Sequence, residues 1–167
     1  MTKILNYKME NGIKCYSPEV ANCYDDYPDS GFALTEKLEN ESFWVHSRSR
    51  LLKKIINKLS LNYLKANFLE IGCGTGTFIR EINDNSKLAI TGSEIYIKGL
   101  LFAKKKLLNV EFVQFDVTKG IISENFDIIG AFDVLEHIDD DSVALANIYK
   151  MLNEGGYFVI TVPQYMF

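Results

Sequence analysis

The sequence contains no long apolar run. No stretch approaches the roughly 20 consecutive apolar residues that a helix needs to cross a bilayer, and the N-terminus has no apolar core of signal-peptide length. Basic residues are not in surplus either, because 22 acidic residues outnumber 18 basic ones and the net charge is -4. We therefore expect a soluble cytoplasmic protein with no membrane partner and no general affinity for nucleic-acid backbones. The only basic run, Lys104–Lys106, is expected to be a solvated helix face.

Cysteine is also scarce. The chain has three, at Cys15, Cys23 and Cys73, and no two of them form a CxxC pair. An odd number without such pairs gives neither a disulfide framework nor a zinc site. We therefore expect reduced thiols, as in other cytoplasmic proteins.

Proline is equally rare, and Pro18 and Pro28 both lie near the N-terminus, together with turn-forming sequences such as Asn11-Gly12. These signals predict that residues 1–40 are largely irregular, with short pieces of strand at best. From Ser42, a suitable N-cap, apolar residues recur at helical spacing and predict a cover helix over about 42–60. We interpret residues 1–60 as an N-terminal extension to a domain that spans 61–167.

Within that domain, strands and helices are predicted to alternate. Short apolar runs predict strands over 67–71, 88–93, 110–115, 126–132 and 157–162. Helical spacing predicts helices over 76–83, 95–108 and 142–152, the last one stopped by Gly155-Gly156. This alternation predicts an α/β fold with a doubly wound, mostly parallel sheet and right-handed crossovers.

A glycine loop follows the first predicted strand of the domain, with Gly72, Gly74 and Gly76 at alternate positions. Glycine permits a tight turn and a close approach of the backbone to a ligand, and open α/β sheets bind ligands at the carboxyl ends of their strands. The spacing is GxGxG, whereas the dinucleotide fingerprint GxGxxG would place its third glycine at Thr77. This difference disfavours a nicotinamide-dependent oxidoreductase.

The segment EIGCGTG, from Glu70 to Gly76, resembles the first motif of class I S-adenosylmethionine-dependent methyltransferases. The resemblance implies a Rossmann-like sheet of order 3-2-1-4-5, with S-adenosylmethionine as the cofactor and S-adenosylhomocysteine as the product. It also implies that the loop wraps the methionine part of the cofactor while the acidic residue orients the ammonium group. The cofactor-binding residues implied by this motif are Glu70, Gly72, Cys73, Gly74 and Gly76.

Two more acidic residues follow the next two predicted strands. Glu94 comes roughly 20 residues after the loop and, with its neighbour Ile95, matches the position that binds the ribose hydroxyls. Asp116 matches the position that contacts the adenine amino group, and Val117 would lend a backbone amide. A lone acidic residue at a strand end is often only a cap or a turn residue. Three in order, at consecutive strand ends, favour a cofactor site.

The segment FDIIGAFDVLEHI resembles the fourth motif of the same family. The resemblance places Phe132 and Asp133 against the cofactor and makes Asp133 and His137 the candidate catalytic residues, with His137 as the base where an acceptor must lose a proton. The spacing of Asp133, Glu136 and His137 also resembles a metal cluster of certain O-methyltransferases, such as those of ubiquinone biosynthesis. Aspartate stands here where that cluster has glutamate, and we expect no metal. The alternative is that Glu136 and His137 cap the following helix.

The stretch ESFWVHSRSR at 41–50 resembles a segment found ahead of the first strand in a group of bacterial methyltransferases. Trp44, His46 and Arg48 are therefore candidates to cover the cofactor or to meet an anionic substrate. In the alternative, Phe43 and Trp44 anchor the helix to the sheet while the arginines face water.

The family usually continues with a sixth and a seventh strand, whereas the last strand predicted here is the fifth. We therefore expect a sheet that lacks those two strands, through truncation, and an exposed sheet edge that permits a homodimer. The expected function is methyl transfer to a small-molecule or glycan-type acceptor. The alternative is a cofactor-binding module without catalysis, because the fold alone does not determine the activity.

Overall fold

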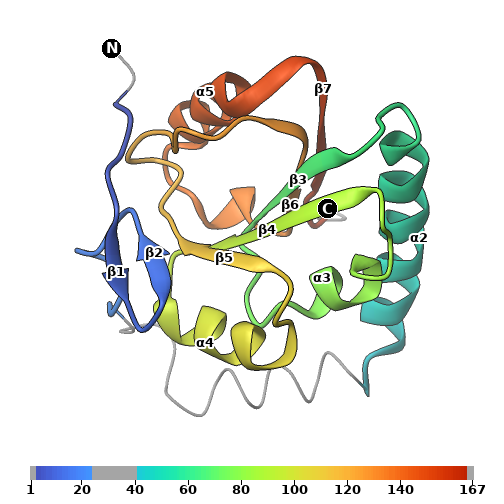
Figure 1. Cartoon of the computed structure of the whole chain (residues 1–167), viewed down its shortest axis with the longest axis horizontal. Coiled ribbons are helices and arrows are strands. Elements are labelled where there is room, and N and C mark those ends of the chain that lie inside the picture. Colours follow the sequence, from blue (N-terminus) through green and yellow to red (C-terminus); the bar gives the residue numbers. More distant parts are fainter. Residues whose placement is uncertain (1–2, 24–40, 165–167) are drawn as a thin grey trace.

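The computed structural model describes residues 3–23 and 41–164 and forms one sheet with helices on both faces (Figure 1). Its strands are β1 (Lys8–Glu10), β2 (Ile13–Cys15), β3 (Ala66–Ile71), β4 (Leu88–Glu94), β5 (Glu111–Gln114), β6 (Phe126–Phe132) and β7 (Leu152–Thr161). Its helices are α2 (Phe43–Ser60), α3 (Thr77–Ile82), α4 (Ile97–Lys106), the 3-10 turn η1 (Leu135–His137) and α5 (Asp141–Met151). The turn signals expected over 24–40 lie outside the described residues.

The strand order is β1-β2-β5-β4-β3-β6-β7. The five strands β5-β4-β3-β6-β7 reproduce the predicted order 3-2-1-4-5, and they pair in parallel throughout. The prediction that the sheet lacks two strands is wrong, because it has seven. The two strands beyond the predicted five are β1 and β2, which extend the sheet past β5 at the left of Figure 1.

The β1–β2 hairpin forms around Asn11 and Gly12, whose φ angles of 50° and 74° are both in the left-handed region. Such residues suit the tight turns that join antiparallel strands. Beyond the hairpin, the backbone N–H of Ser17 donates to the Gln114 side chain at 3.0 Å, and the N–H of Asp116 donates to the Ser17 hydroxyl at 3.2 Å. The N-terminal segment therefore fixes the end of β5. The boundary predicted between residues 60 and 61 stays a prediction.

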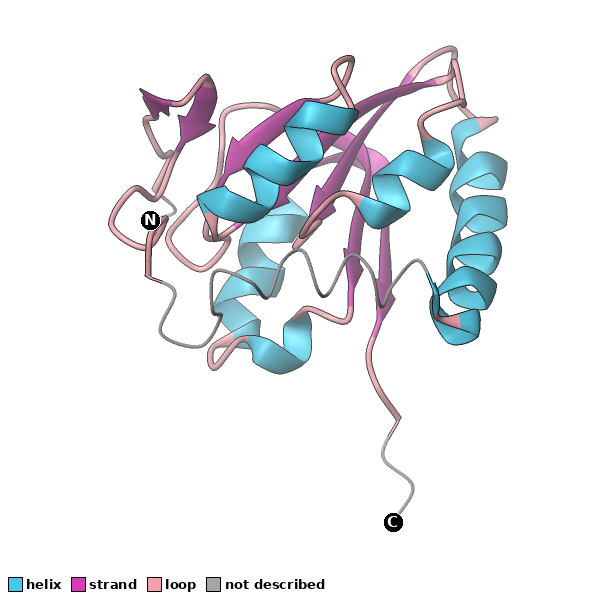
Figure 2. Ribbon diagram, turned by 90° about the horizontal axis from the view of Figure 1, so that it is seen from below, coloured by secondary structure: helices cyan, strands magenta, loops and turns pink. Residues whose placement is uncertain are grey.

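Both faces of the sheet are covered, which explains why its strands are continuous apolar runs. Successive residues of β3 point to opposite faces. Leu69 packs in a buried cluster with Ile148 of α5, whereas Phe68 packs with Leu52 and Ile56 of α2. Helices α3 and α4 lie on the same face as α2, in front of the sheet in Figure 2.

Helix α2 begins where the sequence predicts, because the Ser42 hydroxyl accepts a hydrogen bond from the N–H of Val45 at 3.4 Å. Leu52 and Ile56 are buried, one turn apart, and hold the helix against the sheet. Phe43 and Trp44 are 84% and 71% exposed, so these two aromatic residues do not anchor it.

The prediction that Gly155-Gly156 stops the last helix is wrong. Helix α5 ends at Met151, and β7 starts at once and runs through the glycine pair. Phe126 pairs with Leu152 and Ile128 with Tyr157, so β7 carries extra residues at this point of the ladder. Gly155 lies among these extra residues and has a φ of 74°, in the left-handed region that glycine often adopts in β-bulges. β7 is an edge strand of the sheet, and a homodimer through that edge stays a prediction.

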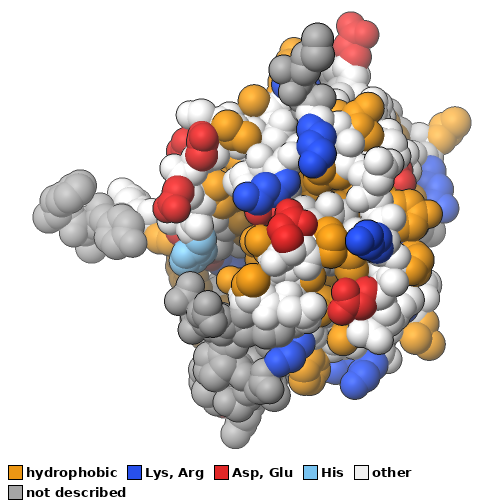
Figure 3. Space-filling model, turned by 90° about the vertical axis from the view of Figure 1, so that its left-hand side faces the viewer, with side chains coloured by type: hydrophobic (Ala, Val, Ile, Leu, Met, Phe, Trp, Pro, Cys, Tyr) orange, Lys and Arg blue, Asp and Glu red, His pale blue; other side chains and the backbone are white. Residues whose placement is uncertain are grey.

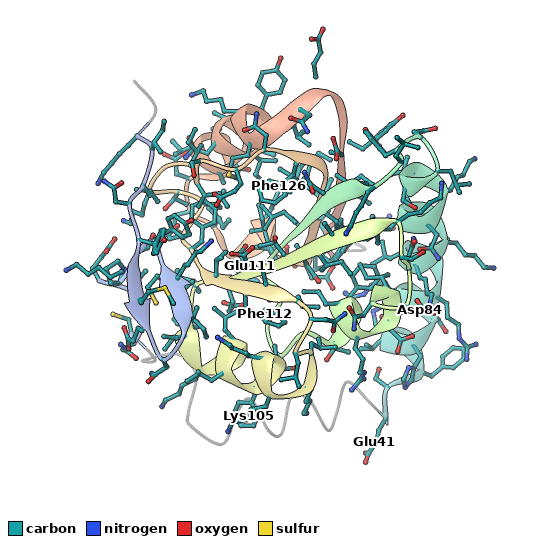
Figure 4. The ribbon with its side chains drawn as sticks, in the orientation of Figure 1. Glu41, Asp84, Lys105, Glu111, Phe112 and Phe126 are labelled. Carbon is teal, nitrogen blue, oxygen red and sulfur yellow. The ribbon has the colours of Figure 1, made fainter. Side chains whose placement is uncertain are left out.

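No helix in the described part of the chain is long and apolar enough to span a membrane. Of the expected solvated lysines at the end of α4, Lys105 and Lys106 are exposed, and Lys105 points away from the sheet (Figure 4). Lys104 is only partly exposed, and its Nζ donates to the carbonyl of Gly12 in the β1–β2 hairpin. On the face that carries the β1–β2 hairpin, basic and acidic side chains are interspersed (Figure 3). The described residues of that face form no continuous basic stripe.

Candidate active site

A cavity of about 560 Å³ lies at the carboxyl ends of four neighbouring strands. Its wall is formed by the loops that follow β3, β4, β5 and β6, the place where open α/β sheets bind ligands. The lining residues are Ile71, Gly72, Glu94, Ile95, Tyr96, Phe115, Asp116, Val117, Asp133, Val134, His137 and Ile138. Its volume is within the range of small-molecule sites.

The cavity brings together many of the site residues that the sequence predicts. The predicted residues in its wall are Gly72, Glu94, Ile95, Asp116, Val117, Asp133 and His137. Sequence reasoning missed the apolar and aromatic part of the wall, including Tyr96, Phe115, Val134 and Ile138. Each of these residues lies one or two positions from a predicted polar residue in the sequence. Proximity to those polar residues is therefore the signal that could have identified them.

A second hollow of about 90 Å³ lies between α2 and the glycine loop. Its lining residues are Val45, Arg48, Ser49, Leu52, Glu70, Gly72, Cys73, Gly74, Thr77, Phe78 and Phe132. Four predicted cofactor residues, namely Glu70, Cys73, Gly74 and Phe132, therefore lie here rather than in the larger cavity. Gly72 lines both, so the two hollows are neighbours across the glycine loop. We call them the large cavity and the small hollow.

The glycine loop has three residues in the left-handed region, with φ angles of 71° at Gly72, 53° at Gly74 and 78° at Gly76. A Cβ at Gly72 would lie 2.4 Å from Val134, so only glycine allows this loop to approach the loop after β6. A Cβ at Gly74 would meet nothing within 4 Å. Gly76 lines neither hollow, and it packs on α4, where its Cβ would lie 3.1 Å from Ala103.

Glu94 joins the glycine loop to the end of β4. One carboxylate oxygen accepts the N–H of Gly74 at 3.0 Å, and the other accepts the N–H groups of Ile95 at 2.8 Å and Tyr96 at 3.4 Å. Burial raises the pKa of Glu94 above its ordinary value, while these three amide hydrogen bonds act in the opposite direction. A carboxylate has about four lone-pair sites, so it retains capacity for a ligand hydroxyl.

Asp116 is a turn residue that also lines the large cavity. Its Oδ1 accepts the backbone N–H of Thr118 at 2.9 Å and the Thr118 hydroxyl at 2.7 Å, which is a turn arrangement. The same residue also lines the large cavity, next to the buried Val117. Its backbone is held from the other side by Ser17.

Asp133 is fixed from three directions at the end of β6. Its backbone N–H donates to the Thr161 carbonyl at 3.0 Å, and its Oδ1 accepts the Thr161 hydroxyl at 2.8 Å. Its Oδ2 forms an ion pair with Nη1 of Arg48, which comes from α2. The φ of Asp133 is 56°, an uncommon conformation for a residue other than glycine and one that clusters at functional sites.

His137 lines the large cavity from η1 and is exposed to solvent. Glu136 is also exposed but does not line the cavity. Across residues 3–23 and 41–164, no group of three or more His, Cys, Asp or Glu side chains is placed to hold a metal ion. Both carboxylate oxygens of Asp133 already face side chains of the chain itself, those of Arg48 and Thr161.

The Cys73 thiol is buried in the wall of the small hollow. Burial raises the pKa of Cys73 well above its ordinary value, and the negative charges of Glu70 and Glu94 raise it further. Both effects oppose formation of the thiolate, which is the nucleophilic form of cysteine.

The comparison with protein families decides the identification. Residues 44–167 match the family described as "Methyltransferase domain". The chain belongs to this family. The matched range includes the glycine loop, α2 from Trp44 onward and all four strand ends that line the large cavity of the methyltransferase domain.

Individual relatives agree with the family. Phosphoethanolamine N-methyltransferase 3 of Arabidopsis thaliana is 28% identical over 140 residues, which are 81% of this chain and 28% of the relative. The methyltransferase domain thus spans less than a third of the length of that relative. The predicted membership of the class I S-adenosylmethionine-dependent methyltransferases is confirmed, and S-adenosylmethionine is the cofactor of this family.

Solved structures share the fold of the methyltransferase domain. An amino pentose methyltransferase of calicheamicin biosynthesis from Micromonospora echinaspora superposes with a TM-score of 0.67 at 19% identity, over 80% of this chain and 56% of that one. The cyclase SpnF superposes with a TM-score of 0.62 at 21% identity, over 72% of this chain and 47% of that one. At such identities the likeness shows the fold alone. Because one of these neighbours is a cyclase, the fold does not determine the reaction.

Proposed function

We propose that this chain binds S-adenosylmethionine across the small hollow and the large cavity and transfers its methyl group to a small-molecule or glycan-type acceptor. One observation carries the proposal: the ends of four neighbouring strands line a single cavity, and each contributes a residue suited to the cofactor or to the acceptor. These residues are Gly72, Glu94, Asp116 and, after β6, His137.

The donors and acceptors present fit the cofactor. Glu70, a buried carboxylate in the small hollow, complements the ammonium group of the methionine part. Glu94 and Asp116, farther along the large cavity, complement the ribose hydroxyls and the adenine amino group. The open space beside Gly74, where a Cβ would meet no atom within 4 Å, leaves room for a ligand against the loop backbone.

When bound, the cofactor supplies a methyl group on a sulfonium that an acceptor attacks in line. The chain contributes mainly position, because holding two reactants in line converts a bimolecular step into an effectively unimolecular one. Phe115, Val134 and Ile138 give the large cavity an apolar wall that excludes water. His137 takes the proton from an acceptor that must lose one. Asp133, held by Arg48 and Thr161, fixes the end of β6 and exchanges no proton.

An amine is the acceptor class that we favour. The Arabidopsis thaliana relative is named for phosphoethanolamine N-methylation, and the structural neighbour from Micromonospora echinaspora for an amino pentose. The large cavity of about 560 Å³ leaves space for a small acceptor beside a bound nucleoside. The acceptors to test first are therefore phosphoethanolamine and simple amino sugars, with hydroxyl analogues as controls.

Titration of S-adenosylhomocysteine into the wild type and into Glu94→Ala tests the cofactor site. We expect the substitution to weaken binding at least tenfold, about 1.4 kcal/mol. Absence of binding to the wild type would reject the proposal. Release of S-adenosylhomocysteine from S-adenosylmethionine, measured for each acceptor, then tests methyl transfer.

The second candidate is a module that binds the cofactor without catalysis. It is favoured by the state of Asp133, a predicted catalytic residue whose two carboxylate oxygens are both engaged by side chains of the chain itself. Cofactor binding without product from any acceptor in the panel would favour this candidate over the first.

A further inference from the structure

Helix α2 presents large apolar side chains to solvent as well as to the sheet. The buried residues Leu52 and Ile56 face the sheet, and α2 forms the right-hand margin of the molecule in Figure 1. On the solvent side, Leu51 is 60% exposed and Ile55, one turn later, is 36% exposed. The exposed Trp44 lies about two turns before Leu51, so these three side chains share one side of the helix. A contiguous apolar surface of this kind marks an interaction site.

The same helix is basic. Its 18 residues include five Lys or Arg and no Asp or Glu, in a chain whose net charge is -4. Two of the five are engaged within the protein, because Arg48 pairs with Asp133 and Lys53 pairs with Asp84. The other three are exposed and form no ion pair within residues 3–23 and 41–164, namely Arg50, Lys54 and Lys58.

The three unpaired basic residues follow one another at intervals of four, so they form a row along the helix. This row lies beside the apolar row, because each of Leu51 and Ile55 directly follows one of the basic residues in the sequence. Both rows lie on the side opposite to the buried residues. We call the two rows together the outer face of α2, which consists of Trp44, Arg50, Leu51, Lys54, Ile55 and Lys58.

We infer that the outer face of α2 docks the protein on the surface of an anionic lipid bilayer. Helices that lie in the membrane interface combine basic residues, which meet anionic headgroups, with tryptophan and aliphatic side chains, which enter the boundary of the acyl chains. The expectation of no membrane partner rests on the lack of an apolar run long enough to cross a bilayer. A helix that lies on the surface needs no such run.

The combination of the two rows favours a bilayer over other partners. A nucleic acid attracts basic residues through its phosphates but offers no apolar surface to Leu51 and Ile55. A second copy of the chain has an apolar row, but a two-fold contact sets the same patch against itself and would place the two basic rows close together. A bilayer with anionic headgroups accommodates both rows at once.

Docking through this face would take place beside the candidate active site. Val45 and Arg48, which lie near the start of α2, line the small hollow, and Trp44 directly precedes Val45. The contact therefore brings the site close to the lipid surface, within reach of an acceptor that is held at the membrane. This last step rests on the proposed function, whereas the docking itself does not.

Trp44 is the only tryptophan in the sequence, so its fluorescence reports on the outer face alone. The test is titration of the protein with vesicles of phosphatidylglycerol and phosphatidylcholine in equal parts, and with vesicles of phosphatidylcholine alone. The anionic vesicles should shift the emission of Trp44 to shorter wavelength, and the protein should sediment with them. Binding to the neutral vesicles should be at least tenfold weaker. High salt should reverse most of the binding to the anionic vesicles, because it screens exposed charges.

Two double variants separate the outer face from charge in general. Lys54→Gln combined with Lys58→Gln should weaken binding to the anionic vesicles at least tenfold, because each basic residue near such a surface contributes about fivefold. Lys105→Gln combined with Lys106→Gln removes the same charge from α4 and should bind within twofold of the wild type.

Two single variants test the apolar row in the same way. Leu51→Gln should weaken binding to the anionic vesicles, whereas Leu108→Gln removes another exposed leucine, after α4, and should not. None of the substituted residues lines the large cavity or the small hollow. All four variants should therefore bind S-adenosylhomocysteine like the wild type, which also shows that they are folded.

The outcomes distinguish this inference from the proposed function. If the wild type binds S-adenosylhomocysteine but not anionic vesicles, the inference is overturned while the proposed function stands. Equal binding to neutral vesicles, or an equal loss of binding in the two double variants, also overturns it. Binding to poly(uridylic acid) without binding to vesicles would overturn it as well, because the outer face would then belong to a nucleic-acid site.

Discussion

The carboxylate of Glu94, the last residue of β4, accepts a hydrogen bond at 3.0 Å from the backbone N–H of Gly74, which lies in the loop after β3. The residue proposed to bind the ribose therefore also holds the loop proposed to wrap the methionine part. Its second oxygen holds Ile95 and Tyr96 at the start of α4. One partly buried carboxylate thus preorganises the frame on which both ends of the cofactor would lie.

This arrangement predicts that cofactor affinity depends on pH. Burial raises the pKa of Glu94, and the ionised form is the better acceptor for ribose hydroxyls. We expect the affinity for S-adenosylhomocysteine to fall as the pH drops through this raised pKa, in calorimetric titrations from neutral to mildly acidic pH. Glu94→Gln should bind more weakly at neutral pH and lose this dependence. A wild type whose affinity is equally flat would contradict the assignment of Glu94.

Stability of the ligand-free protein should respond in the opposite direction. Because the pKa of Glu94 is higher in the folded than in the unfolded chain, the folded state binds more protons between the two values. The contribution of Glu94 to the free energy of unfolding is thus lost as the pH rises through that window. Chemical denaturation of the wild type and Glu94→Gln at several pH values should show this slope in the wild type alone. Equal slopes would show that another group is responsible.

The glycine loop allows a matched pair of substitutions. Gly74 and Gly155 have φ angles of 53° and 74°, and a Cβ at either one would meet nothing within 4 Å. Substitution of either glycine by alanine should therefore introduce a similar backbone strain. We expect each variant to lose about 1–2 kcal/mol in the free energy of unfolding, measured by thermal denaturation. Only Gly74→Ala is expected to lose S-adenosylhomocysteine binding, because Gly74 lines the small hollow and Gly155 lies in β7. If both variants bind like the wild type, the ligand does not approach this backbone.

Most of the polar wall of the large cavity could be predicted from the sequence because its signals are local. Gly72, Glu94 and Asp116 each lie at or just after the end of a strand, and parallel strands bring their carboxyl ends to one edge of the sheet. The partner of Arg48 could not be predicted in this way. Its ion pair with Asp133 depends on how α2 packs beside β6, and no local pattern in either segment specifies that contact.

The errors in the fold also arise where local signals are ambiguous. Strands β1 and β2 have three residues each, too few to show an alternating pattern. The pair Gly155-Gly156 is as suitable for a bulge as for a helix end, and the ladder between β6 and β7 decides the matter. That pairing is a tertiary interaction between segments whose sequences do not specify it.

The three cysteines should differ sharply in reactivity. Cys23 is exposed, whereas Cys15 and Cys73 are buried, and burial raises the pKa of both Cys15 and Cys73. Because the thiolate is the reactive form, a chromogenic disulfide reagent should modify one thiol quickly in the native protein and all three in denaturant. Cys23→Ser should abolish the fast phase. Fast modification of Cys73 in that variant would mean that the glycine loop opens in the ligand-free protein.

His137 and its neighbour Glu136 provide the test of acid–base chemistry. Both are exposed on η1, but only His137 lines the large cavity. For an acceptor that must lose a proton, His137→Gln should lower kcat by about 10²–10⁴, the usual contribution of a general base, and leave the affinity for S-adenosylhomocysteine unchanged. An amine that arrives already deprotonated needs no base, so its methylation should be less affected, and the loss of kcat should shrink as the pH rises.

Glu136→Gln is the control for this test. It changes a charge one residue away without touching the cavity wall, so its kcat should stay within twofold of the wild type. Equal losses of kcat in the two variants would assign the effect to the local charge or to the geometry of η1. A loss of kcat that is confined to His137→Gln, but is the same for every acceptor and at every pH, would assign His137 to binding the acceptor. Proton removal, in contrast, depends on whether the acceptor still carries the proton.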